Sequence, residues 1–74
     1  MTAQIKLLGI LKSYVGNQSQ IEVNAGNTVR EAMRALNIPS ELVALVLVNN
    51  TPQTKEYCLQ AGDVVMLMAV VGGG

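Results

Sequence analysis

The chain has no histidine, tryptophan or phenylalanine, and its single cysteine is Cys58. One cysteine cannot form a disulfide within the chain, and the absence of histidine excludes a site built from clustered cysteine and histidine ligands. We therefore expect no metal site. Lys55 is the basic residue nearest to Cys58 in sequence, so little is available to activate the thiol, and we interpret Cys58 as a small apolar residue.

The chain also has few aromatic residues and no excess of charge of either sign. The chain has two tyrosines, and its five basic residues balance five acidic ones to a formal net charge of +0. Without a basic stripe or aromatic rings that could stack on bases, we expect no binding to nucleic acid. Tyr14 and Tyr57 are more typical of packing residues whose hydroxyl groups reach water.

No long hydrophobic segment is present either. The apolar run near the C-terminus, residues 64–71, is much shorter than the roughly 20 residues that a membrane-spanning helix needs. Residues 1–6 lack the charged-then-apolar pattern of a secretory signal. We expect a cytoplasmic protein that is a monomer when alone and has no membrane partner.

Apolar residues make up 50% of the sequence, which is enough for one small domain with an aliphatic core. Alternating or continuously apolar segments predict five strands. They are Ala3–Ile10, Gln20–Asn24, Val43–Val48, Thr51–Thr54 and Val64–Ala69. The last segment is apolar throughout, which is typical of a strand at the centre of a sheet, whereas Pro52 confines its own strand to an edge.

One amphipathic helix is predicted to follow Thr28. Thr28 and Glu31 have the spacing of a capping box, in which each side chain bonds the backbone N–H of the other. Apolar residues then recur at helical spacing, at Val29, Ala32, Met33 and Leu36. Asn37 and the Ile38-Pro39 pair end this helix, and a shorter helical segment is predicted over Leu11–Gly16.

These elements predict an α+β domain over residues 1–69, in which the helix covers one face of a sheet and leaves the other face open. The last strand is apolar on both sides. We therefore expect some of Met66, Met68, Leu8 and Ile10 to lie on the open face, where an apolar surface indicates a protein partner.

The sequence ends in Val70-Val71-Gly72-Gly73-Gly74, here called the glycine tail. Glycine adds no side chain to a core and loses more backbone entropy on ordering than any other residue. Fully extended, the five residues would reach roughly 17 Å beyond the last strand. Residues 70–74 are therefore interpreted as a flexible tail, which is either a terminus without a role or a thin arm that carries the terminal carboxylate into another protein.

Taken in order, several of these segments resemble the ubiquitin-like sulfur carriers of the MoaD/ThiS family, which comprises molybdopterin synthase small subunits and thiamine sulfur carriers. The resemblance covers the whole chain. It is carried by residues 25–29 before the helix, residues 46–49 before a turn, residues 59–65, and the glycine tail. It implies a ubiquitin-like β-grasp fold, with a mixed four- to five-stranded sheet and one main helix packed on one face.

The resemblance also implies a carrier rather than an enzyme. An E1-like adenylyltransferase would use ATP and Mg²⁺ to convert the carboxylate of Gly74 into an acyl adenylate, and the chain itself would bind no cofactor. A sulfur donor, such as a cysteine desulfurase or a rhodanese, would then give a C-terminal thiocarboxylate, with Gly73 as a slim neighbour. The residues implied to contact partner enzymes are Met66, Met68, Leu8, Val70, Val71 and Gly72.

Two enzymes are open as the sulfur acceptor, the large subunit of molybdopterin synthase and thiazole synthase. The long segment Leu8–Gly16 slightly favours the molybdopterin branch, whereas the Val-Val-Gly-Gly-Gly ending is commoner in the thiamine branch. Two other functions are compatible with the sequence. One is a ubiquitin-like modifier whose Gly74 forms isopeptide bonds with lysines, and the other is a β-grasp interaction domain with no reactive terminus.

Overall fold

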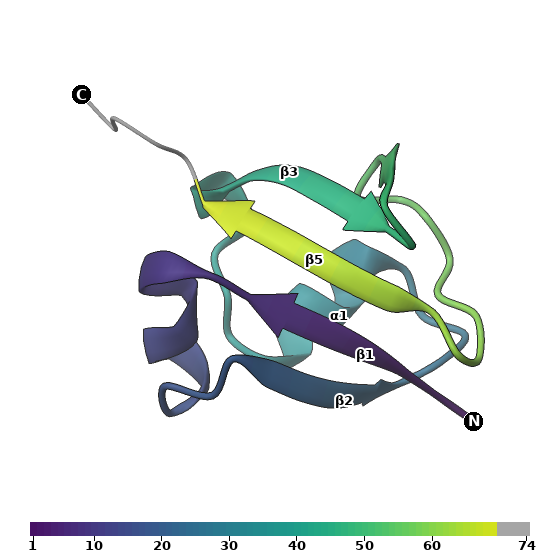
Figure 1. Cartoon of the computed structure of the whole chain (residues 1–74), viewed down its shortest axis with the longest axis horizontal. Helices are drawn as coiled ribbons and strands as arrows, with labels where there is room; N and C mark the ends of the chain where they lie inside the picture. Colours follow the sequence, from purple (N-terminus) through teal and green to yellow (C-terminus); the bar gives the residue numbers. More distant parts are fainter. Residues whose placement is uncertain (70–74) are drawn as a thin grey trace.

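The computed structural model describes residues 1–69, and residues 70–74 lie outside the described part of the chain. The elements in chain order are β1 (Thr2–Leu7), the 3₁₀ helix η1 (Gly9–Val15), β2 (Gln20–Asn24), α1 (Val29–Ala35), the 3₁₀ helix η2 (Ser40–Leu42), β3 (Val43–Val48), β4 (Thr51–Gln53) and β5 (Val64–Ala69). The five strands and the main helix predicted from the sequence are all present (Figure 1).

The five strands form one sheet in the order β2-β1-β5-β3-β4. β1 and β5 run parallel, while the other three neighbouring pairs are antiparallel, so the sheet is mixed. β5 lies at the centre, as its continuous apolar sequence predicts. α1 crosses behind the sheet in Figure 1, and the two layers confirm the predicted α+β arrangement with one main helix on one face.

The core between helix and sheet is aliphatic. Alternate residues of the two central strands are fully buried in it, Ile5 and Leu7 from β1 and Val65 and Leu67 from β5. The helix contributes buried residues at helical spacing, namely Val29, Ala32 and Met33. Strand and helix periodicity therefore meet in one core, as the sequence predicts.

The capping box at the start of α1 is formed as predicted. The Thr28 hydroxyl accepts a hydrogen bond from the Glu31 N–H at 3.1 Å, and the Glu31 carboxylate accepts one from the Thr28 N–H at 2.9 Å. The helix ends at Leu36 as its C-cap, and Asn37 follows in the left-handed region with φ of 60°. Among the helices of residues 1–69, none is long and apolar enough to cross a membrane.

The prediction that the first strand extends to Ile10 is wrong. β1 ends at Leu7, and the backbone turns at Gly9, where φ is +63°. The 3₁₀ helix η1 begins there, two residues before the predicted start of the helical segment, and buries Leu11 completely. Ile10 is consequently 59% exposed. Periodicity alone could not place this boundary because apolar residues continue across it.

The β3–β4 hairpin turns on two asparagines. Asn49 and Asn50 both have positive φ, at 51° and 68°, which suits the tight turns that join antiparallel strands. Pro52 lies opposite Leu47 on β4, at the edge of the sheet. A proline is tolerated there because an edge strand has one side that needs no ladder hydrogen bond.

Candidate functional site

The sheet face that α1 leaves uncovered, here called the open face, is the candidate site. Its residues alternate along each strand with residues that are buried in the core or face the helix side. They are Gln4 and Lys6 of β1, Gln20 and Glu22 of β2, Leu45 and Leu47 of β3, Pro52 of β4, and Val64, Met66 and Met68 of β5. The central strand of this face is the one that leads into residues 70–74.

The side chains of Met66 and Met68 lie on the open face. Val65 and Leu67 are fully buried against the helix side, so the methionines between and after them point the other way, and both are half-buried. Leu8 has an extended backbone (φ −126°, ψ 151°) that continues the alternation of β1, and its side chain is 45% exposed. The structure thus brings the three described partner-binding candidates to one side of the sheet.

The open face divides into an apolar half and a polar half. On β3, Leu47 lies opposite Met66 and Leu45 lies opposite Met68, and Pro52 extends the apolar half to β4. Sequence reasoning did not select Leu45 or Leu47, because the run that contains them is apolar throughout and gives no signal of which residues face outward. Only the register against β5 assigns them to the open face.

The polar half lies over β1 and β2. The Gln20 amide donates a hydrogen bond to the Gln4 side-chain oxygen, and the Thr2 hydroxyl donates to the Glu22 carboxylate at 2.9 Å. These pairs hold the edge strand β2 against β1. Polar groups on this half are therefore largely satisfied within the sheet.

The start of β5 is fixed by the buried carboxylate of Asp63, which is 7% exposed. It accepts hydrogen bonds from the Tyr57 hydroxyl at 2.9 Å, from the Asn49 side-chain amide at 3.0 Å and from the Gln60 N–H at 2.9 Å. The Asn49 side-chain oxygen in turn accepts from the Val64 N–H at 3.1 Å. One carboxylate thus ties the β3–β4 turn and the preceding loop to the first residue of the central strand.

This network shifts two pKa values. Burial alone would raise the pKa of Asp63, but the hydrogen bonds from Gln60, Tyr57 and Asn49 stabilise the carboxylate and lower that pKa below its ordinary value of 3.8. The hydrogen bond to Asp63 raises the pKa of Tyr57 above its ordinary value of 10.0, and burial adds to this rise. The Tyr57 hydroxyl was expected to reach water, and instead it donates to Asp63.

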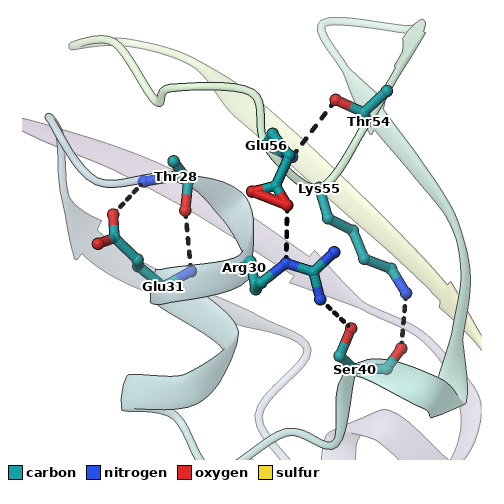
Figure 2. A network of polar contacts seen from close by, with 7 residues as sticks. All are labelled: Thr28, Arg30, Glu31, Ser40, Thr54, Lys55 and Glu56. Atoms are coloured by element: carbon teal, nitrogen blue, oxygen red, sulfur yellow. Dashed lines mark hydrogen bonds and ion pairs between the residues drawn. The ribbon is translucent and has the colours of Figure 1, made fainter.

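A second polar network braces the helix side of the molecule, away from the open face (Figure 2). Arg30 of α1 forms an ion pair with Glu56 at 2.9 Å and donates to the Ser40 hydroxyl at 3.3 Å, and the Lys55 ammonium donates to the Ser40 carbonyl at 2.7 Å. These contacts join α1, η2 and the loop after β4. Arg30 and Lys55 are therefore both engaged in contacts within residues 1–69.

Cys58 is exposed, and its interpretation as a small apolar residue rather than an activated thiol stays an interpretation. Its backbone pairs with Thr28 in an isolated bridge, and its thiol lies 3.3 Å from the Gly26 carbonyl. The neighbouring Leu59 is the buried member of this loop. Within residues 1–69, no three histidine, cysteine, aspartate or glutamate side chains gather in a group that could hold a metal ion.

The remaining site candidates are Gly74, Gly73, Gly72, Val71 and Val70, and all five lie outside the described residues. The described chain stops at Ala69, the last residue of β5, whose register partner on β3 is Val43. The predicted division into a domain of residues 1–69 and a tail of residues 70–74 stays a prediction.

Comparisons with solved structures place the fold among ubiquitin-like proteins. SAMP1 from Haloferax volcanii is 23% identical with a TM-score of 0.73, and each chain covers 100% of the other. Urm1 from Trypanosoma brucei is 18% identical with a TM-score of 0.71, over 99% of this chain and 95% of that one. At these identities the likeness establishes the fold, which is the predicted ubiquitin-like β-grasp.

A third structure of the same fold is a complex of subunits 1 and 2 of molybdopterin-converting factor from Helicobacter pylori. The matching chain is 22% identical with a TM-score of 0.63, and each chain covers 100% of the other. No curated protein matches the chain in sequence. The model of the ThiS family matches residues 5–74, which is nearly the whole chain. The chain therefore belongs to the ThiS family.

Proposed function

We propose that the chain is a sulfur carrier protein whose reactive group is the carboxylate of Gly74. The observation that carries this proposal is the central position of β5, which leads directly into the glycine tail while its outward methionines lie on an apolar face. Membership of the ThiS family supports the same function. The protein acts as a carrier with partner enzymes rather than as an enzyme itself, in the cytoplasm and as a monomer when alone.

The chemistry proposed for the tail begins with activation. A carboxylate is a poor electrophile, so an E1-like adenylyltransferase with ATP and Mg²⁺ joins a Gly74 oxygen to the α-phosphate and releases pyrophosphate. A sulfur nucleophile from a cysteine desulfurase or rhodanese-type donor then attacks the carbonyl carbon, and AMP leaves. A thiolate, supplied by a second cysteine of the donor or by a small thiol, then attacks the donor sulfur, forms a disulfide with it and releases the thiocarboxylate of Gly74. Gly73 has no Cβ to crowd the attacking sulfur.

The open face is the proposed docking surface for the partner enzymes. Met66, Met68 and Leu8 form its centre, and Leu45 and Leu47 extend it across β3. Methionine side chains are unbranched and adapt to different surfaces, which suits a carrier that meets an activating enzyme and a sulfur acceptor in turn. Val70, Val71 and Gly72 are proposed to enter the partner together with the reactive end.

For the sulfur acceptor we propose the large subunit of molybdopterin synthase first and thiazole synthase second. The likeness to the Helicobacter pylori subunit complex and the long connection from Leu8 to Gly16 favour the first, and the match to the ThiS family is compatible with both. A second candidate function is protein modification through an isopeptide bond to Gly74. The likeness to a structure named as small archaeal modifier protein 1 from Haloferax volcanii is the observation in its favour.

Intact-protein mass spectrometry tests the proposal. The purified chain is incubated with the adenylyltransferase of its own organism, ATP, Mg²⁺ and a cysteine desulfurase with cysteine. We expect the mass to rise by the difference between one sulfur and one oxygen atom, and the gain to disappear when ATP is omitted. A chain that gains no mass would contradict the carrier function, and lysine-linked conjugates in a lysate would favour the modifier.

A further inference from the structure

The ammonium group of Lys6 lies on the open face and has no partner among residues 1–69. The Lys6 ammonium takes part in no hydrogen bond or ion pair there, whereas Arg30 and Lys55 are both engaged on the helix side. Among the described residues, Glu22 is the one carboxylate on the open face. It lies opposite Gln4 rather than Lys6 and accepts from Thr2.

Lys6 stands at the boundary between the polar and apolar halves of the open face. A single row of register partners crosses the sheet from the polar edge to the apolar edge, namely Gln20, Lys6, Met66, Leu47 and Pro52. The cation is therefore placed beside the central strand, next to the side chain proposed to dock partners. Figure 1 shows β1 and β5 side by side at the middle of the sheet.

Beside Lys6 the open face is hollowed. A hollow of about 360 Å³ is lined by Lys6, Leu47, Asn49, Asn50, Val64 and Met66. The Asn49 side chain is already used by Asp63 and by the Val64 N–H. This leaves the ammonium of Lys6 and the side-chain amide of Asn50 as the polar groups without a partner among the described residues.

The chemistry of this hollow selects for an acidic group. An ammonium offers hydrogen-bond donors and no acceptor, and an asparagine amide can add two donors. The rest of the lining is Leu47, Val64 and Met66, whose apolar side chains can pack against the methylene groups of an acidic side chain that enters. Since the whole chain has a formal net charge of +0, overall charge cannot select an acidic partner, and only a local contact can do so.

We propose that Lys6 determines partner specificity by receiving an aspartate or glutamate side chain of the partner enzyme in this hollow. The inference rests on the proposed function, because it assigns the partner's chemistry at the same docking surface. The partner surface it predicts is apolar where it covers Met66 and Met68, with one carboxylate beside that apolar area. Complementary charges across a docking surface favour the matching partner and disfavour partners with a like charge at that place.

The position of Lys6 also predicts how far the partner's carboxylate lies from the channel that receives the glycine tail. Lys6 is the register partner of Met66, which lies three residues before Ala69 at the end of β5. At about 3.3 Å per residue, the predicted carboxylate lies roughly 10 Å from the point where the chain leaves the sheet. An activating enzyme or sulfur acceptor that fits therefore carries an acidic side chain at about that distance from the mouth of its tail-binding channel.

Calorimetric titration of the full chain against the adenylyltransferase of its organism tests the inference. Two matched pairs of variants remove or reverse one positive charge, Lys6→Met and Lys6→Glu on the open face and Arg34→Met and Arg34→Glu on α1. Arg34 is exposed and lies on the helix side. We expect Lys6→Met to weaken binding about tenfold and Lys6→Glu still more, while both Arg34 variants stay within about twofold of the wild type.

The possible outcomes separate the inference from the function on which it rests. If the wild type binds, and Lys6→Met and Arg34→Met bind with the same affinity as each other, the role of Lys6 is overturned and the carrier function stays intact. Failure of the wild type to bind would overturn both. Unchanged circular dichroism spectra and melting temperatures of the variants, expected because Lys6 is exposed, exclude misfolding as the cause of weaker binding.

A second measurement identifies the acidic group directly. A carbodiimide joins an ammonium and a carboxylate in contact through an amide bond with loss of water. Treated with this reagent, the complex should give a cross-linked peptide between Lys6 and an aspartate or glutamate of the adenylyltransferase. A cross-link map in which Lys12 or Lys55 reacts with the partner and Lys6 does not would also overturn the inference.

Discussion

At the scale of single residues, Asp63 has a role that its sequence context conceals. It follows Gly62, and a Gly-Asp pair is typical of a turn. In the structure the Asp63 carboxylate is buried and accepts hydrogen bonds from the Tyr57 hydroxyl, the Asn49 side-chain amide and the Gln60 N–H. Periodicity could not reveal this because the donors lie in the β3–β4 turn and in the irregular loop before β5, where no repeating pattern relates them. The turn was predictable from the residues, and the hydrogen-bond network was not.

Replacing Asp63 with alanine should lower the free energy of unfolding by about 1–3 kcal/mol, since several buried donors lose their acceptor. Urea denaturation followed by circular dichroism measures the change. Glu56→Ala is the control, because the Arg30–Glu56 pair it removes is largely exposed and should contribute less than about 1 kcal/mol. Equal losses in the two variants would contradict the role assigned to Asp63.

The same carboxylate predicts how stability depends on pH. The pKa of Asp63 is lowered on folding, so its contribution is fully present above the unfolded value of 3.8 and is lost as pH falls through the lower, folded value. We expect Asp63→Asn to be less stable than the wild type at neutral pH and to lose less of its stability on acidification below about pH 4. Parallel acid curves for the two proteins would contradict this prediction.

At the scale of elements, β5 connects the core to the docking surface. Val65 and Leu67 hold it from one side, and Met66 and Met68 are presented on the other. The sequence predicted the outward position of Met66 and Met68 through the resemblance, because a strand that is apolar on both faces shows no alternation. It could not predict that Leu45 and Leu47 join the same surface, because that depends on the register of β3 against β5. The sequence also placed the end of β1 too late, because Leu8 and Ile10 are apolar although neither lies in the core.

Met68→Glu should weaken binding to the partner enzymes by at least about tenfold, because a carboxylate at the centre of the apolar half must be desolvated on docking. Its melting temperature should stay close to that of the wild type, since the side chain lies on the open face. Ala35→Glu adds the same charge at an exposed position of α1 and serves as the control. Equal affinity of Met68→Glu and the wild type would remove Met68 from the interface.

At the scale of the whole molecule, folding and reactivity are assigned to different parts of the chain. The core described above is built from residues between Ala3 and Leu67, whereas the proposed chemistry belongs to Gly74. The fold class was predictable because the local signals in the sequence, from the capping box to the apolar central strand, all indicate the same arrangement of one helix on a sheet. The reactive role came from the resemblance and not from periodicity, since glycines alone are equally compatible with a terminus without a role.

Deleting Gly74, or replacing Gly73 with a bulky residue such as tryptophan, should abolish sulfur loading in the mass-spectrometric assay. The melting temperature should change by no more than a degree or so, because about 1 kcal/mol corresponds to roughly 4–8 °C in a domain of this size and the core of the described residues is complete by Leu67. A large fall in melting temperature would show that residues 70–74 belong to the fold. Retained sulfur loading would contradict the assignment of Gly74.

The parallel pairing of β1 and β5 has a mechanical consequence. Because the two strands run in the same direction, the start of β1 and the end of β5 lie at opposite ends of the sheet (Figure 1). A partner that pulls on the chain beyond Ala69 therefore applies a force along the axis of β5. The hydrogen bonds that join β5 to β1 and to β3 resist this force together, in shear. Several ladder hydrogen bonds share that force at once instead of opening one after another. A carrier built in this way can have its end drawn into an enzyme without having its central strand peeled from the sheet.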